Sequence, residues 1–262
     1  MTSKPSLTVL VVGATGSIGR LVVAEALRQG HSVRALVRDA HKAARLPASA
    51  SMIVGDVTRH ETLVAAVEGI DAVVLTLGSE GAGKAGAESV DYGGVRNIFT
   101  ALGDRPARIA LMTAIGVTNR TGDYNRRTQA HDWKRRAERL VRASKRPYTM
   151  VRPGWFDYQA ADEQRIVMLQ GDTRQAGDAT DGAIARAQIA RVLVDSLTSG
   201  TAENKTFELV AEKGGAQTDL AAVFASLEPD DPASLDAIRD ADNQPLADEP
   251  QRVRDDLEAI QN

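Results

Sequence analysis

The sequence contains no cysteine and few aromatic residues, and both shortages exclude classes of function. Without cysteine there is no disulfide, no thiol nucleophile and no thiolate metal site, and the composition agrees with a reducing cytoplasm. Four scattered histidines lack the paired spacing of metal ligands, so no metal site is expected. At 4% aromatic residues, the chain lacks stacking platforms for single-stranded nucleic acid. A net charge of −3 gives no general attraction to nucleic acid or acidic membranes.

Long apolar runs and targeting signals are missing as well. No run approaches the ~18 apolar residues of a membrane span, and the first residues, MTSKPS, lack the apolar segment of a signal peptide. We therefore expect a cytoplasmic protein whose partner is a small-molecule substrate, with no membrane and no nucleic-acid partner. The sequence does not indicate an oligomeric state. At 262 residues, 43% hydrophobic and 26% charged, the chain is long enough for one full core.

The most informative stretch is 11–20, with the sequence VVGATGSIGR. An apolar run ends at Gly13, and Gly16 and Gly19 follow at intervals of three before a helical pattern begins. Strand, glycine turn and helix in this order are the context in which a glycine triplet binds phosphate, although a tight turn with incidental glycines would share the spacing. The expected dinucleotide contacts in this stretch are Gly13, Thr15, Gly16, Ser17, Ile18 and Gly19.

Each glycine of the triplet is expected to have its own structural role. Gly13 lets the chain reverse tightly where a side chain would clash. Gly16 lets the backbone approach a pyrophosphate, which then lies on the free N–H groups of the following helix. Gly19 lies near the centre of the apolar stripe of that helix, so the helix can press closely on the sheet.

Apolar strands and helical patterns alternate along the chain, which predicts an α/β fold with a doubly wound parallel sheet and helices on both faces. We expect one domain, with a dinucleotide-binding core at about 7–153, a substrate-side extension at 154–227 and an acidic tail at 228–262. The expected strands are 7–12, 31–37, 51–55, 71–76, 107–113 and 148–152, with shorter ones at 165–170 and 206–210. The expected helices begin near 19, 61, 87, 129 and 186.

The tail permits two interpretations. Its eleven acids against three arginines, together with four prolines, are typical of a flexible acidic segment. Val253, Leu257 and Ile260, however, are spaced for one face of a short helix, which favours docking onto the domain.

The end of the second expected strand selects between the two nicotinamide cofactors. An acidic residue there holds the ribose hydroxyls of NAD, whereas an arginine meets the 2′-phosphate of NADP. Arg38 comes first and Arg20 follows the third glycine, so two cations are expected near the phosphate, which favours NADP. The alternative is that Arg38 stacks on adenine while Asp39 binds the ribose, so NAD stays possible.

After the third strand, Asp56 and Val57 are placed to contact adenine, and Asp56 could also cap a helix.

These residues together resemble the atypical short-chain dehydrogenase/reductases, especially the NmrA-like, NAD(P)-binding branch. The resemblance covers about 7–210 and rests on the glycine motif, Arg38-Asp39, Gly55-Asp56-Val57 and the VRPG sequence at 151–154. It implies a Rossmann core of about seven parallel strands, with NAD(P) across the strand ends. It also places Thr76, Leu77 and Gly78 beside the cofactor, where the alternative is a simple loop.

The resemblance implies a Ser or Thr after the fifth strand, and a Tyr four residues before a Lys, as the groups that carry the chemistry. Thr113 and Lys134 match two of these positions and are expected to contact the cofactor, but Ala130 stands where the tyrosine belongs. His131 is a candidate acid on the same helix flank as Lys134, with an exposed helix-start residue as the alternative. The candidate catalytic residues are thus Thr113, Lys134 and His131.

Several neighbouring side chains are open to two interpretations. Asp91 is expected either to serve a helix dipole or to face the cofactor cleft. The arginines of the helix that carries Lys134 are expected to form a solvated face; they are Arg135, Arg136, Arg139 and Arg142. Trp155, Phe156 and Tyr158 are expected either to wall the substrate site or to pack in the core.

The sequence thus favours an NADP(H)-dependent oxidoreductase that acts on a small carbonyl, quinone or flavin-like acceptor. Hydride transfer belongs to the cofactor, so a missing tyrosine does not forbid it when solvent supplies the proton. The alternative is an NmrA-like redox sensor that binds NAD(P) without turnover. A sugar-nucleotide epimerase is the weakest interpretation, because that chemistry also needs the absent tyrosine.

Overall fold

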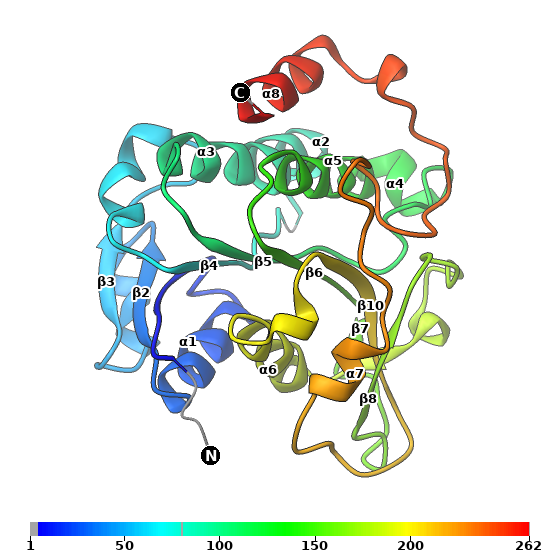
Figure 1. Ribbon diagram of the computed structural model, residues 1–262, viewed down its shortest axis with the longest axis horizontal. Coiled ribbons are helices and arrows are strands. Elements are labelled where there is room, and N and C mark those ends of the chain that lie inside the picture. The colour runs from blue at the N-terminus through cyan, green and yellow to red at the C-terminus, as the bar shows by residue number, and fades with distance from the viewer. Residues whose placement is uncertain (1–4, 80, 262) are drawn as a thin grey trace.

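The structure is a computed structural model that describes residues 5–79 and 81–261. A twisted central sheet lies between two layers of helices (Figure 1). The lower layer in that view holds α1 and α6, and the upper layer holds α3 and α5. The chain is thus a three-layer α/β structure, as the alternation of strands and helices predicts.

The central sheet has eight strands in the order β3-β2-β1-β4-β5-β6-β10-β8. The first seven are parallel and only β8 runs antiparallel, beside β10. In chain order they are β1 Thr8–Val12, β2 Ser32–Val37, β3 Ser51–Val54, β4 Ala72–Leu75, β5 Arg108–Met112, β6 Tyr148–Pro153, β8 Arg165–Leu169 and β10 Lys205–Glu212. The expectation of a Rossmann sheet with seven parallel strands is confirmed. The two short strands expected in the extension join this sheet, so the extension completes it.

The helices vary in regularity. The α-helices are α1 Gly19–Arg28, α2 Gly83–Gly86, α3 Gly93–Leu102, α4 Asp123–Thr128, α5 Ala130–Ala143, α6 Arg186–Ser196, α7 Ala221–Ala225 and α8 Gln251–Gln261. A π-helical segment, Ala87–Tyr92, joins α2 to α3. The helix expected at about 61–67 is two 3-10 turns, His60–Thr62 and Val64–Val67, and the loop expected to reach 128 contains α4.

The two faces of the sheet form two separate cores. In β1, Val9 and Val11 pack against α1 and α6, while Leu10 and Val12 pack against the layer of α3 and α5. All four side chains are fully buried. A strand covered on both faces has no polar face, which explains why the first strand is a continuous apolar run.

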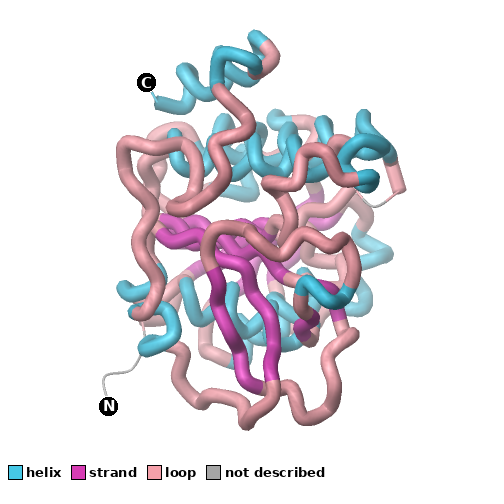
Figure 2. The backbone as a smooth tube through the Cα atoms, turned by 90° about the vertical axis from the view of Figure 1, so that its right-hand side faces the viewer, coloured by secondary structure: helices cyan, strands magenta, loops and turns pink. Residues whose placement is uncertain are grey.

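The C-terminal segment docks on the domain. Both views place α8 outside the upper helix layer (Figure 1, Figure 2), and it contacts α5 and α3. Val253 and Leu257 are buried, and Ile260 packs against the same core. The docked interpretation of the tail is therefore right, because three apolar side chains on one helix face need a cover.

The expectation of a solvated arginine face on α5 is wrong. All four arginines are buried, and Arg135 and Arg139 are only 1% exposed. Arg139 binds Glu249 at 2.7 Å and Asp236 at 2.8 Å, and Arg142 binds Asp230 at 3.3 Å. The carboxylates come from the tail, about one hundred residues away in the sequence. The basic face of α5 and the acidic tail neutralise each other's charge. No local pattern in either segment reveals this pairing.

Within the described residues, no helix is long and apolar enough to cross a membrane.

Candidate functional site

The glycine turn between β1 and α1 is held by close backbone contacts. Gly13 has a φ of +83°, and a Cβ built on it would lie 2.8 Å from the Thr76 carbonyl oxygen of the neighbouring strand end. A Cβ on Gly19 would lie 2.1 Å from the Gly13 carbonyl oxygen. Gly19 therefore lets α1 press on the turn itself, which is closer than the contact with the sheet that we expected.

The start of α1 offers backbone donors. The Gly16 N–H donates to the Gly13 carbonyl at 2.9 Å, and the Arg20 N–H donates to the Gly16 carbonyl at 3.2 Å. Between them, the N–H groups of Ser17 and Ile18 have no acceptor among the described residues. No acidic side chain stands in the first turn of α1. Free N–H groups at the positive end of a helix form an anion site.

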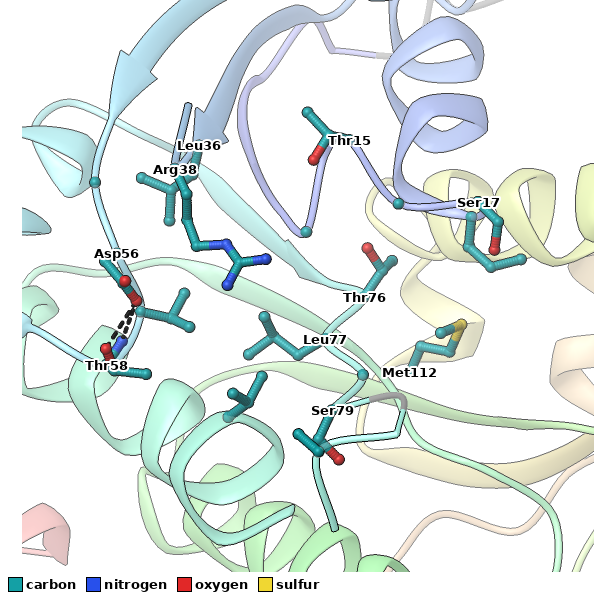
Figure 3. A pocket seen from close by; sticks show the side chains of 18 of the residues that line it. Thr15, Ser17, Leu36, Arg38, Asp56, Thr58, Thr76, Leu77, Ser79 and Met112 are labelled. Carbon is teal, nitrogen blue, oxygen red and sulfur yellow. Dashed lines mark hydrogen bonds between the residues drawn. The ribbon is translucent and has the colours of Figure 1, made fainter. Parts of the chain in front are cut away.

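An open cleft of about 850 Å³ lies beside this turn, at the carboxyl ends of the parallel strands (Figure 3). Its volume is in the range of small-molecule and cofactor sites. Eleven of the expected site residues line it together, although they come from four separate segments; they are Gly13, Thr15, Gly16, Ser17, Ile18, Arg38, Asp56, Val57, Thr76, Leu77 and Gly78. Gly19, Thr113, His131 and Lys134 are not among its lining residues.

One end of the cleft is basic. Arg38 follows β2, and His41 and Arg45, on the 3-10 turn Ala40–Arg45, line the same cleft. The Asp39 carboxylate accepts a hydrogen bond from the His41 N–H at 2.9 Å and caps that turn. Asp39 is not a lining residue. His41 and Arg45 were not among the predicted site residues, although the sequence shows a cap residue, Asp39, followed by these basic residues. Arg20 is exposed on α1 and lines no part of the cleft, so the expected convergence with Arg38 is wrong.

Asp56 lines the same end and is oriented by its own turn. Its Oδ1 accepts from both the N–H and the hydroxyl of Thr58, each at 2.9 Å. The hydrogen bond from the Thr58 backbone lowers the pKa of Asp56, and the positive charge of Arg38 lowers it further. Asp56 is thus an ionised acceptor beside the cleft, and its second carboxylate oxygen, Oδ2, has no hydrogen bond within the described part of the chain.

The other end of the cleft is less polar. Met112 at the end of β5 and Ser79 lie at this end (Figure 3), and Phe156 on β7 (Trp155–Phe156) is a further lining residue of the cleft. Strand β7 pairs with β9 (Ala183–Ile184) at the edge of the extension. Trp155 is 38% exposed and Tyr158 is 68% exposed, and their rings contact one another edge to face. Of the three expected aromatics, only Phe156 is a cleft residue.

Thr113 is buried behind the cleft rather than in it. Its hydroxyl donates to Glu138 at 2.7 Å, and Glu138 is held by Arg152 at 2.6 Å. Burial alone would raise the pKa of Glu138, but the guanidinium groups of Arg152 and Arg142 outweigh it and lower the pKa to about 2. The hydroxyl proton of Thr113 therefore points at a carboxylate that is ionised at neutral pH.

Lys134 is likewise bound to a carboxylate. Its Nζ lies 2.8 Å from Asp91, whose other oxygen accepts from the Ser79 hydroxyl at 2.6 Å. The Asp91 side chain is 1% exposed. Asp91 is not among the lining residues of the cleft, so it does not face the cleft itself. It lies behind Ser79 and joins that lining residue to Lys134.

His131 is half-buried at the start of α5. Its ring lies 5.0 Å from that of Tyr124, and its Nδ1 has no hydrogen-bond partner in the described part of the chain. Burial lowers its pKa, because the charged imidazolium is disfavoured there. The histidine is thus held neutral and lies outside the cleft.

The family profile described as NAD(P)H-binding matches residues 13–200, which is most of the chain. The chain belongs to the NAD(P)H-binding family. The matched range begins at the first glycine of the turn and ends after α6, so it contains the whole lining of the cleft. The resemblance to the atypical short-chain dehydrogenase/reductases is confirmed at this level.

Individual relatives are distant. The photosystem II assembly factor Ycf39 of Synechocystis is 28% identical over 217 residues, which are 82% of this chain and 65% of that protein. Sanguinarine reductase of Eschscholzia californica is 27% identical over 268 residues, with 86% of this chain and 97% of the reductase covered. The solved structure of an anaerobillin reductase from Escherichia coli O157:H7 has a TM-score of 0.64 at 20% identity, over 80% of this chain and 100% of that chain. The structural likeness shows a shared fold.

Proposed function

We propose that this protein binds NADP(H) in the cleft and transfers hydride to a small carbonyl, quinone or flavin-like acceptor. The observation that carries the proposal is the basic end of the cleft, where Arg38, His41 and Arg45 gather while Asp39 is turned away into a helix cap. Two relatives or structural neighbours named as reductases support the same class of reaction.

The basic end favours NADP(H) over NAD(H). A 2′-phosphate needs cations and N–H donors, whereas the free 2′-hydroxyl of NAD needs a carboxylate acceptor. Asp39 is not a lining residue of the cleft, and its Oδ1 accepts the hydrogen bond from the His41 N–H. Arg38 can bind phosphate with two parallel hydrogen bonds, and Arg45 adds a second positive charge. The pyrophosphate would lie on the free N–H groups of Ser17 and Ile18.

The bound cofactor would supply the hydride, and the protein would supply orientation and shielding. Met112 and Phe156 would cover one side of the reacting ring and exclude water. Thr113 and Lys134 donate to buried carboxylates, so we assign them positioning roles through Glu138 and Asp91. Acceptors that take their proton from water are therefore the expected substrates.

The hydrogen bonds of Thr113 to Glu138 and of Lys134 to Asp91 also favour a second candidate. This candidate is a regulatory protein that senses the ratio of NADPH to NADP⁺ without turnover. Oxidation of NADPH in the presence of a panel of quinones, flavins and aldehydes separates the two candidates. Turnover with any acceptor supports the reductase. Tight NADPH binding with no turnover across the panel supports the sensor.

Equilibrium binding tests the cofactor assignment. NADPH is expected to bind more tightly than NADH, and Arg38→Ala should weaken NADPH binding by about tenfold or more, because a charge-assisted hydrogen bond is lost. NADH binding should change little. Arg20→Ala removes an arginine outside the cleft and is the matched control, with no change expected for either nucleotide. Equal affinities for NADPH and NADH in the parent protein would contradict the proposal.

A further inference from the structure

A chain of three polar side chains leads from the cleft into the protein. Ser79 lines the cleft, and its hydroxyl donates to Asp91 at 2.6 Å. Asp91 in turn accepts from Lys134 at 2.8 Å. The Lys134 side chain is only 14% exposed and that of Asp91 only 1%, so this series of hydrogen-bonded side chains ends inside the helix layer.

Burial explains why Asp91 and Lys134 occur together. A carboxylate that is taken out of water without a counter-ion is strongly unfavourable, and the ammonium group of Lys134 supplies that counter-ion. Asp91 lies in the π-helical segment Ala87–Tyr92, between α2 and α3. Such segments place side chains at angles that a regular helix does not reach, and they are frequent at functional sites.

The carboxylate fixes the polarity of the Ser79 hydroxyl. A serine hydroxyl has one proton and two lone pairs, and here the proton is given to Asp91. Ser79 can therefore only accept hydrogen bonds from the cleft. A ligand group at this point must be a donor, and a ribose hydroxyl is such a group.

The position of Ser79 indicates which ribose. Arg38 and Asp56 lie at one end of the pocket, while Ser79 and Met112 lie toward the other end, beyond Leu77 (Figure 3). If the 2′-phosphate is bound at Arg38, the adenine half of the dinucleotide occupies the basic end, and the nicotinamide half extends toward Met112. Ser79 is then beside the ribose of the nicotinamide half.

Resting on the proposed function, we propose that Ser79 accepts a hydrogen bond from a hydroxyl of the nicotinamide-side ribose. Asp91 and Lys134 are positioning residues that hold the Ser79 hydroxyl as an acceptor. Lys134 thus acts on the cofactor indirectly, through the Asp91 carboxylate and the Ser79 hydroxyl. The residue four positions before Lys134 is Ala130 and not the tyrosine that the resemblance implies.

The test compares two probes on the full chain by titration calorimetry. NADPH carries the nicotinamide ribose, and adenosine 2′,5′-bisphosphate lacks it. Ser79→Ala should weaken NADPH binding about five- to tenfold, the effect of one lost hydrogen bond, and leave the bisphosphate within twofold. Asp91→Asn should do the same, because an amide can donate to Ser79 and reverse its polarity. Ser226→Ala, an exposed serine on the opposite helix layer, is the control. Thermal melting checks that each variant is folded.

The outcomes separate this assignment from the proposed function. Normal NADPH affinity in Ser79→Ala, or an equal loss for both probes, would overturn the assignment while NADP(H) binding stands. A parent protein that binds neither probe would overturn both. An Asp91→Asn protein that melts normally and binds NADPH like the parent would remove Asp91 and Lys134 from the site.

Discussion

Single residues decide the shape of the cofactor cleft at two places. A Cβ on Gly13 would clash with Thr76, and a Cβ on Gly19 would clash with the Gly13 carbonyl, so neither position has room for a side chain. At the basic end of the cleft, the Asp39 carboxylate caps a short turn and does not line the cleft. The lining there therefore combines Arg38, His41 and Arg45 with the carboxylate of Asp56 and not with that of Asp39. Both effects depend on individual atoms, not on composition.

Replacement of Gly19 by alanine should disrupt the site. The new Cβ would stand 2.1 Å from the Gly13 carbonyl oxygen, which is backbone and cannot move without opening the turn. We expect a loss of about 1–3 kcal/mol in the free energy of unfolding and a large loss of NADPH affinity, measured by urea denaturation and by titration. Gly200→Ala, with no atom near the new Cβ, is the control and should change neither. An unchanged NADPH affinity in Gly19→Ala would contradict the proposed role of the turn.

At the scale of elements, α5 and the C-terminal segment depend on each other. The arginines of α5 are buried because the tail brings carboxylates to them, and the tail is ordered because α5 presents the arginines. Arg136 and Arg139 share Glu249, at 2.6 and 2.7 Å. The pairing also fixes the helix that carries Lys134.

Glu249→Gln should therefore be costly although it lies far from the cleft. It leaves Arg136 without a carboxylate partner in a buried site, and breaking a buried pair in this way costs about 3–5 kcal/mol. The measurement is the free energy of unfolding from urea denaturation. Glu61→Gln removes the carboxylate of an exposed pair with Arg59, and should cost less than about 1 kcal/mol. Similar losses in the two variants would show that the tail pairing is not a buried ion network.

At the scale of the whole molecule, buried charges give the stability a pH dependence. Arg152 is fully buried and is surrounded by Glu138, Glu208 and Asp240. Burial raises the pKa of Glu208 to about 7, Arg152 opposes this, and the carboxylates of Asp172 and Asp240 add to it. Between pH 4.5 and 7 the folded protein thus holds a proton that the unfolded chain releases, and the free energy of unfolding falls as the pH rises through this window.

Glu208→Gln should remove this dependence. The interval from about 4.5 to about 7 corresponds to roughly 3 kcal/mol, so the variant should gain up to that amount relative to the parent between pH 4.5 and pH 8. Urea denaturation of both proteins at the two pH values measures the gain. A difference between the proteins that is the same at both pH values would contradict the shifted pKa of Glu208.

Much of this architecture follows from local sequence signals. The seven parallel strands were predictable because buried strands carry apolar runs and alternate with helices, and the glycine turn was predictable because its three glycines have separate local causes. Eleven of the expected site residues share the cleft because parallel strands bring their carboxyl ends to one edge. The prediction of a regular α-helix near residue 61 was wrong, because the helical pattern there is short and a short pattern does not distinguish an α-helix from 3-10 turns.

The sequence by itself determined the order of strands and helices, the family and the place of the cleft, because these depend on periodicity and on residues close in the chain. Only the tertiary structure decided which charges are paired. Arg139 and Glu249, Lys134 and Asp91, and Thr113 and Glu138 are separated by 110, 43 and 25 positions. A side chain that is solvated in one packing is buried and neutralised in another, and only the position of its partner in space decides between them.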